Sequence, residues 1–84
     1  MRVEFFGLSR ERAGVAEIEV QADTLGQLFG VLAVQFPSLA DLIGVGPLSA
    51  SLVANLNGDQ FVRDPALRLG KDDRVLILSA DAGG

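Results

Sequence analysis

Apolar and β-branched residues gather in five short stretches of the chain, and each stretch is typical of a β-strand. Polar and apolar residues alternate in the second stretch, whereas the last one is unbroken, which predicts a central strand. The five predicted strands are Arg2–Leu8, Val15–Val20, Ser51–Gly58, Gln60–Val62 and Arg74–Ala80. The polar link between the first two ends in Gly14, so we expect a turn there and an antiparallel hairpin.

A long helix is predicted between the second and third strands. Thr24, with Gln27 three residues later, matches a capping box, and Pro37 ends the helix. Gly26 and Gly30 weaken the helix unless close packing against the sheet uses their missing side chains. The apolar residues recur at helical spacing on one face: Leu25, Leu28, Phe29, Leu32 and Phe36.

The segment after Pro37, SLADLIG, predicts a short second helix capped by Ser38. The element order is therefore β-β-α-β-β-β, an α+β fold of the β-grasp, ubiquitin-like kind. We expect a mixed sheet of four to five strands, with the long helix and the short second helix on one face. A chain of 84 residues suffices for one domain, so residues 1–80 are assigned to the β-grasp domain and residues 81–84 to a flexible diglycine tail.

Strand alternation sorts the apolar residues of the first and last strands onto two faces. The set expected to face the helix consists of Val3, Phe5, Val75 and Ile77. The other set stands among charged residues on the open face of the sheet and consists of Phe6, Leu76 and Leu78. A face that mixes charged and apolar residues is expected to dock a partner. The alternative is that helices cover both faces of the sheet.

The overall composition limits the classes of partner. Hydrophobic residues make up 49% of the chain, which indicates either a dense core or an apolar surface that a partner covers. The net charge of −4 disfavours nucleic acid, and the apolar runs are too short to span a membrane. The N-terminal segment MRVEFFGLSRERAG lacks the features of a secretory signal, so a cytoplasmic protein is expected.

The chain lacks Cys and His, which removes the usual nucleophile, general base and soft metal ligands. Tyr and Trp are absent as well, and the glycine pair Gly44 and Gly46 is too weak a motif to indicate a phosphate loop. The neighbouring acids Asp72 and Asp73 are better explained as a solvated turn than as a metal or acid–base site. We therefore expect no bound metal or cofactor, and no catalysis by this chain alone.

The last two residues, Gly83 and Gly84, point to a different chemistry. Glycine has no Cβ, so a diglycine can enter a narrow channel and deliver the α-carboxylate of Gly84 to the active site of a partner. A carboxylate becomes electrophilic once it is activated, for instance as a mixed anhydride with AMP, and sulfur or an amine can then attack it. The plainer interpretation is an incidental chain end, because chain ends usually fray.

Three segments together resemble the MoaD/ThiS sulfur carriers, which are ubiquitin-like β-grasp proteins. These segments are VEFFGLSRERAG, LNGDQFVRDPALRLGKDDRVLIL and the terminal GG, and the resemblance extends over essentially the whole chain. It favours the small subunit of molybdopterin synthase. The resemblance implies that an E1-like enzyme uses ATP to adenylate Gly84, which then becomes a thiocarboxylate and donates sulfur in molybdenum cofactor biosynthesis.

The same resemblance implies partners and residue roles. The tail would thread into the large synthase subunit, or into another sulfur acceptor, through Asp81, Ala82 and Gly83. The positions that align with apolar partner contacts of the family are Phe6, Phe61 and Leu78. Two of them, Phe6 and Leu78, are also residues that strand alternation assigns to the open face.

Other functions remain open at this stage. The stretch Ser79-Ala80-Asp81-Ala82 departs from the molybdopterin branch, which commonly has two prolines there, so thiamine, cysteine or tRNA thiolation pathways are alternatives. A second class is a ubiquitin-like modifier whose Gly84 is joined to lysines of target proteins. The chain itself has one lysine, Lys71, so self-linked chains through several lysines are not available. A third class is a plain β-grasp interaction module.

Overall fold

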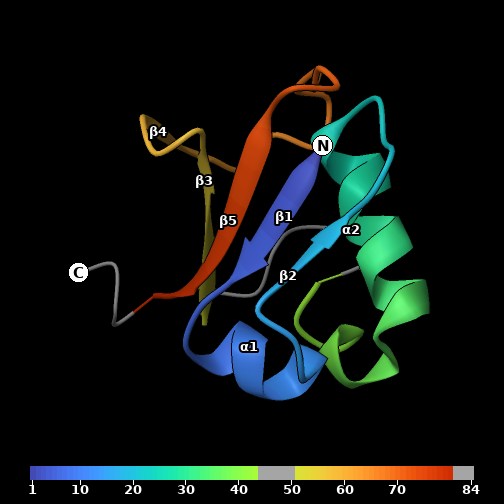
Figure 1. The fold of residues 1–84 in the computed structure, drawn as a ribbon, viewed down its shortest axis with the longest axis vertical. Helices are drawn as coiled ribbons and strands as arrows, with labels where there is room; N and C mark the ends of the chain where they lie inside the picture. Colours follow the sequence, from blue (N-terminus) through green and yellow to red (C-terminus); the bar gives the residue numbers. More distant parts are fainter. Residues whose placement is uncertain (44–50, 81–84) are drawn as a thin grey trace.

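The computed structural model describes residues 1–43 and 51–80 of the chain (Figure 1). Within these residues, strands form one mixed sheet in the order β2-β1-β5-β3-β4. The strands are β1 (Arg2–Phe5), β2 (Glu17–Glu19), β3 (Leu52–Leu56), β4 (Gln60–Val62) and β5 (Arg74–Ser79). The helices are α1 (Leu8–Ala13) and α2 (Leu25–Gln35), with a 3-10 turn, η1, at Pro37–Leu39.

The first and last strands lie side by side at the centre of the sheet and run parallel. Their register sets Val3 beside Val75 and Phe5 beside Ile77. The pairs β1–β2, β3–β4 and β3–β5 are antiparallel. The central position of β5 agrees with its unbroken apolar run, and the mixed sheet with its helices confirms the predicted α+β, β-grasp class.

Helix α2 begins where the sequence predicts. Thr24 Oγ1 accepts a hydrogen bond from the backbone N–H of Gln27 at 3.1 Å, and Gln27 Oε1 accepts one from the N–H of Asp23 at 2.5 Å. These two bonds satisfy backbone donors that the start of a helix leaves unpaired. The helix ends at Gln35, two residues before Pro37.

Helix α2 closely approaches the segment that precedes β5. The N–H of Gly26 donates to Pro65 O at 3.0 Å, and a Cβ added at Gly26 would lie 2.9 Å from Pro65 Cβ. The missing side chain of Gly26 therefore allows close packing, but the packing is against this loop and not against the sheet. At Gly30, by contrast, an added Cβ would meet nothing within 4 Å in the part of the chain that the structure describes.

The hydrophobic core lies between α2 and one face of the sheet. As strand alternation predicts, the sheet contributes four residues that are at most 1% exposed: Val3, Phe5, Val75 and Ile77. The helix contributes Leu25, Leu28, Phe29 and Leu32, which are equally buried. Phe36 also belongs here, and its ring meets that of Phe5 edge to face at 5.5 Å between centroids. Burial of such side chains, about 1.5–3 kcal/mol each, is the main stabilisation of the fold.

The link between β1 and β2 differs from the prediction. The sequence predicts a strand Arg2–Leu8 followed by a turn, but the chain leaves β1 at Phe5 and forms helix α1. Gly7 has a positive φ of 62°, which turns the chain out of the strand. The predicted antiparallel pairing of β1 with β2 is correct. A helix of six residues is too short to show apolar periodicity, so the sequence indicated only a polar link.

The predicted second helix after Pro37 is wrong in type and extent. The structure has the 3-10 turn η1 there, and Ser38 does not cap it. Ser38 instead joins η1 to α1, because its Oγ donates to Arg12 O while Arg12 Nη1 donates to Ser38 O at 2.8 Å. The short α-helix of the fold is α1, earlier in the chain. The loop predicted after SLADLIG, residues 45–50, lies outside the described residues.

Candidate functional site

The face of the sheet that turns away from α2 carries an apolar patch, which we call the open face. Its apolar members are Phe6, Val53, Phe61, Leu76 and Leu78. Leu78 lies opposite Val53 in the β3–β5 pairing, so two neighbouring strands contribute to one surface. Phe61 is 61% exposed and Phe6 is 38% exposed, and the other three are half-buried. The open face therefore unites all three residues predicted to contact a partner.

Phe6 belongs to the open face although it lies beyond the end of β1. Its backbone N–H donates to Ile77 O at 2.9 Å, which extends the pairing with β5 by one residue. Because side chains alternate along such a ladder, Phe6 is directed away from the core that holds Phe5. The prediction from sequence alternation is thus correct for the side of the sheet on which Phe6 lies.

A polar residue lies in the middle of the open face. Asn55 pairs with Leu76 on one side and with Phe61 on the other. Its Oδ1 atom is buried from solvent and has no hydrogen-bond donor among the described residues. A buried acceptor without a donor costs about 1–3 kcal/mol, and an N–H group of a docked protein would remove that cost. The sequence analysis missed Asn55; the available signal was a lone amide at an outward position of the apolar strand SLVANL.

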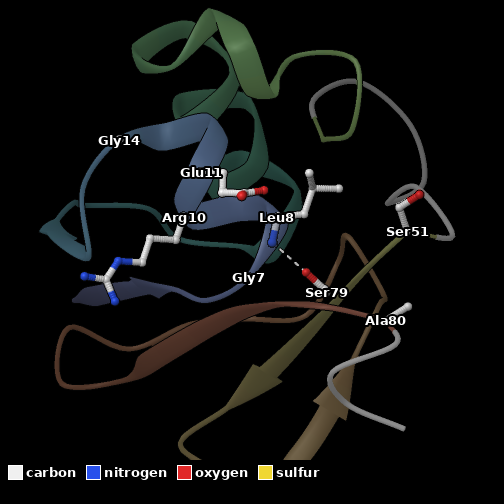
Figure 2. Close-up of a pocket in the computed structure, with 8 residues that line it drawn as sticks. All are labelled: Gly7, Leu8, Arg10, Glu11, Gly14, Ser51, Ser79 and Ala80. Carbon is white, nitrogen blue, oxygen red and sulfur yellow. Dashed lines mark hydrogen bonds between the residues drawn. The ribbon is translucent and has the colours of Figure 1, made fainter.

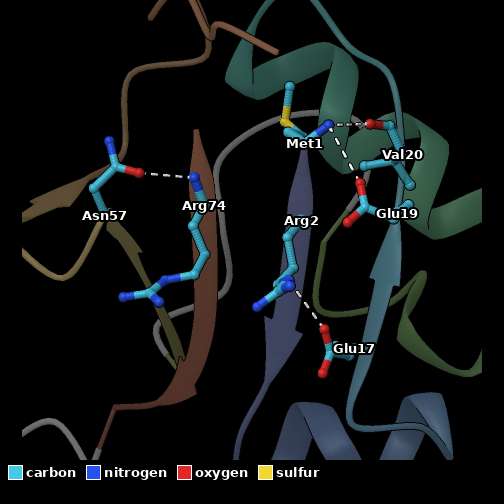
Figure 3. Close-up of polar contacts among 7 residues, drawn as sticks. All are labelled: Met1, Arg2, Glu17, Glu19, Val20, Asn57 and Arg74. Carbon is cyan, nitrogen blue, oxygen red and sulfur yellow. Dashed lines mark hydrogen bonds and ion pairs between the residues drawn. The ribbon is translucent and has the colours of Figure 1, made fainter. Parts of the chain in front are cut away.

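Two ion pairs border the apolar part of the open face. Arg2 Nε lies 3.0 Å from Glu17 Oε2, and Arg74 Nε lies 3.2 Å from Glu4 Oε2. Figure 3 shows the first of these pairs, between β1 and β2, with Arg74 on the adjacent strand β5. Partly exposed pairs contribute little to folding, about 0–1 kcal/mol each. Their mixed charges instead provide a pattern that can orient a docking partner.

The end of β5 is held from both sides. Ser79 Oγ accepts a hydrogen bond from the N–H of Leu8 at 2.6 Å, as Figure 2 shows. Ser9, which is fully buried, donates from its Oγ to Ile77 O at 2.7 Å. On the other side, the N–H of Ala80 donates to Ser51 O at 2.9 Å. These bonds fix the position at which the chain leaves the sheet after β5.

The close contact between α1 and β5 requires a glycine at position 7. A Cβ added to Gly7 would lie 2.3 Å from Ser79 Oγ, a distance at which atoms overlap. The positive φ of Gly7 also disfavours any residue with a side chain. The glycine therefore allows the hydroxyl of Ser79 to reach the N–H of Leu8.

A groove opens beside the end of β5, between α1 and the start of β3 (Figure 2). Its volume is about 1050 Å³, and it is lined by Gly7, Leu8, Arg10, Glu11, Gly14, Ser51, Ser79 and Ala80. The chain continues from Ala80, so the predicted tail starts at this groove. The tail residues themselves lie outside the described residues: Asp81, Ala82, Gly83 and Gly84.

The acids predicted to form a solvated turn lie before the start of β5, at the end opposite the groove. Asp73 Oδ2 accepts a hydrogen bond from the N–H of Gly70 at 2.7 Å, and Asp73 Oδ1 accepts one from Asn57 Nδ2 at 3.0 Å. Both hydrogen bonds lower the pKa of Asp73, and the one from the Gly70 backbone has the larger effect. Asn57 Oδ1 also accepts from the N–H of Arg74 at 2.7 Å (Figure 3), so Asp73 helps to join the β3–β4 turn to β5.

Residues 1–43 and 51–80 contain no group of three acidic residues arranged to hold a metal ion. In the same ranges, no helix is long and apolar enough to cross a membrane. The weak glycine pair, Gly44 and Gly46, lies outside the described residues. The candidate site therefore consists of the open face and the fixed end of β5.

Comparison with known proteins identifies a fold relative. No family model matches the chain, and no curated protein does. Among solved structures, the chain is similar to the crystal structure of SAMP1 from Haloferax volcanii, with a TM-score of 0.76 and 22% sequence identity. The similarity covers 99% of this chain and 97% of that chain. The chain therefore has a ubiquitin-like β-grasp fold.

Proposed function

We propose that this protein is a ubiquitin-like sulfur carrier. In this proposal the carboxyl group of Gly84 is adenylated by an E1-like enzyme and converted to a thiocarboxylate. The observation that carries the proposal is the course of β5, which contributes Leu76 and Leu78 to the open face and then ends at Ser79, one residue after Leu78. One strand thus links a surface suited to docking with the base of the tail.

The arrangement favours a partner that binds the open face and receives the tail in the same encounter. The bonds of Ser79 and Ala80 hold the end of β5 in place, so the start of the tail has a fixed position relative to Leu78. A tail that starts from a fixed point loses less conformational freedom when it enters a channel. Docking energy from the open face would then contribute to positioning the reacting carboxyl group.

The chemistry of the proposal proceeds in two steps. A carboxylate oxygen of Gly84 attacks the α-phosphorus of ATP, a new P–O bond forms, and pyrophosphate leaves. A hydrosulfide ion, HS⁻, then attacks the carbonyl carbon, the new C–S bond forms as the bond to the AMP oxygen breaks, AMP leaves, and the S–H proton is released to solvent. The product is a thiocarboxylate on Gly84, which can give its sulfur to an acceptor.

The side chains of this protein take no direct part in those steps. The buried hydroxyl groups of Ser9 and Ser79 are engaged in structural hydrogen bonds, and the chain has no Cys or His. Catalysis and ATP binding therefore belong to the partners in this proposal, and this chain binds no cofactor or metal of its own. It contributes the docking surface, the tail and the transferred atom.

The specific pathway that we propose is molybdenum cofactor biosynthesis, with this protein as the small subunit of molybdopterin synthase in the cytoplasm. The support is the resemblance of VEFFGLSRERAG and LNGDQFVRDPALRLGKDDRVLIL to that branch. The large synthase subunit would bind the open face through Phe6, Phe61 and Leu78, and Asp81, Ala82 and Gly83 would thread into it. A basic side chain at its channel entrance would accommodate Asp81.

A second candidate is a protein modifier, favoured by the fold similarity to SAMP1, a ubiquitin-like small archaeal modifier protein. The adenylation step is shared by both functions. In the modifier, the attacking atom is the amine nitrogen of a target lysine, so AMP leaves as an amide bond forms and a proton is released. The two candidates therefore differ only in the nucleophile.

ATP–pyrophosphate exchange tests the step that both candidates share. An E1-like activating enzyme incubated with this protein should exchange labelled pyrophosphate into ATP, and deletion of Gly84 should abolish the exchange. The Gly84 deletion leaves the described domain unchanged in sequence, so its unfolding transition serves as the control. Equal exchange with and without Gly84 would rule out the acyl-carrier function and leave an interaction module.

A further inference from the structure

The side of α2 that faces away from the sheet is apolar and uncharged. We call it the α2 outer face; it borders a shallow hollow of about 570 Å³ and consists of Gln27, Gly30, Val31, Val34 and Gln35. No charged residue occurs anywhere along α2, and Val34 is 83% exposed. A surface helix normally directs charged side chains to solvent, so this composition indicates a face that another surface covers.

Gly30 supports the same interpretation independently. A glycine inside a helix is destabilising relative to alanine, and folded proteins usually place it where close packing needs the space. Gly26 meets that condition through Pro65, but nothing in residues 1–43 and 51–80 comes within 4 Å of a Cβ added at Gly30. The missing side chain leaves a notch in the α2 outer face that is open to the outside.

We propose that a second copy of this chain covers the α2 outer face in a symmetric dimer. The face is self-complementary, because the protruding side chain of Val34 lies about one helical turn from the notch at Gly30. An antiparallel crossing centred between these two residues would seat Val34 of each copy over Gly30 of the other. Such reciprocal contacts are the requirement of a two-fold interface.

Charge favours this face over the rest of the surface for self-association. The chain carries a net charge of −4, so two copies repel each other at long range. Contact through α2 brings no charged side chain of this helix against its counterpart. The open face is bordered by four charged residues: Arg2, Glu4, Glu17 and Arg74. Contact between two open faces would therefore place like charges against each other, unless the two copies were aligned so that each charge met an opposite one.

The size of the face predicts a weak and reversible dimer. One face of an eleven-residue helix is smaller than the roughly 800 Å² per partner of a standard stable interface, so we expect dissociation constants of about 10 µM or weaker. The α2 outer face lies on the opposite side of the molecule from the open face. The dimer would therefore leave both open faces free, and the inference does not depend on the proposed function.

Sedimentation velocity of the full chain over rising protein concentration tests the dimer. The wild type should shift towards twice the monomer mass, and Val34→Lys should remain monomeric because the longer, charged lysine side chain would not fit the apolar notch at Gly30 of the other copy. Val15→Lys is the matched control, since Val15 is also exposed, at 41%, but lies between α1 and β2. Thermal unfolding of both variants confirms that each is folded.

Gly30→Ala gives a second measurement in which stability and association move in opposite directions. Alanine favours the helix and its Cβ would meet nothing within 4 Å among the described residues of the monomer, so the melting temperature at low concentration should rise by about 4 °C. The same methyl group would occupy the notch that receives Val34, so the dissociation constant should increase at least about tenfold.

Two results would overturn the proposal. One is a wild-type chain that stays monomeric at every concentration, which would leave the α2 outer face to a different partner. The other is equal association of the wild type, Val34→Lys and Gly30→Ala, which would locate any dimer contact elsewhere on the molecule.

Discussion

Three small residues, Gly7, Ser9 and Ser79, hold the end of β5 against the start of α1. Ser79 and Ser9 supply hydrogen bonds that a larger or apolar side chain would not make, and Gly7 supplies the space for them. None of the three carries chemistry for acyl transfer. Their contribution is to fix the point from which the proposed reactive tail starts.

Substitution of Gly7 by alanine should be costly for folding. The added Cβ would overlap Ser79 Oγ in a backbone conformation with positive φ, so we expect a loss of about 2–3 kcal/mol in the free energy of unfolding. Gly14→Ala is the control, because Gly14 has a φ of 78° but a Cβ added there would meet no described residue within 4 Å, and it should lose about 1 kcal/mol. Urea unfolding measures both. Equal losses would mean that the contact with Ser79 is unimportant.

Asp73 should make the stability of the fold depend on pH at the acidic end. Its pKa is lowered by N–H donors, so the ionised carboxylate stabilises the folded state above the ordinary carboxyl pKa of about 3.9. This contribution is lost as the pH falls through the lowered pKa. Asp73→Asn should therefore reduce stability near pH 7, by about 1 kcal/mol, and should change it little at the most acidic pH.

The measurement for Asp73 is urea unfolding of the wild type and Asp73→Asn across the acidic range. Asp72→Asn is a suitable control, because no hydrogen bond or ion pair of the Asp72 side chain occurs within the described ranges. A difference between wild type and Asp73→Asn that is independent of pH would contradict the assigned role of the carboxylate.

At the scale of elements, predictability followed the length of each periodic pattern. Alternation over β1 and β5 correctly separated Val3 and Val75 from Leu76, because a period of two is readable in six residues. The capping box and stripe of α2 were readable for the same reason. Helix α1 and turn η1 were not, because six and three residues hold too few repeats and their geometry depends on contacts such as Arg12 with Ser38.

The open face gives a prediction that separates docking from folding. Phe61 is 61% exposed, so Phe61→Asp should change the free energy of unfolding by no more than about 0.5 kcal/mol. The same change should weaken binding to the activating enzyme by about tenfold or more, because it places a charge in an apolar contact. Val15→Asp, at an exposed position off the open face, is the control in calorimetric titration. If Phe61→Asp binds the activating enzyme as tightly as Val15→Asp does, the open face is not the docking surface.

The whole molecule has two apolar surfaces on opposite sides of one small core. The open face adjoins the end of β5, and the α2 outer face lies across the core from it. The high hydrophobic content of the chain thus reflects both a dense core and exposed apolar surface, the two interpretations that composition left open. Sequence alternation predicted the open face, whereas the notch at Gly30 depends on what approaches the helix in three dimensions.

The candidate site could be predicted from sequence only in part. Alternation and family resemblance identified Phe6 and Leu78 together, but the register that unites Asn55 with Leu76 and Phe61 required the sheet pairing. The groove beside Ala80 depends on α1, which the sequence did not predict. Gly84, whose carboxyl group is the proposed reactive group, lies outside the described residues, so the proposal for it comes from the chemistry of a diglycine tail.

The intact mass of the protein after incubation with an E1-like activating enzyme, ATP and a sulfur donor tests the central claim most directly. The account predicts a gain equal to the replacement of one oxygen atom by sulfur, lost on deletion of Gly84 and reduced in Phe61→Asp but not in Val15→Asp. An unchanged mass with an enzyme that activates the chain, or amide-linked adducts of the chain with other proteins in place of the sulfur gain, would contradict the sulfur-carrier function.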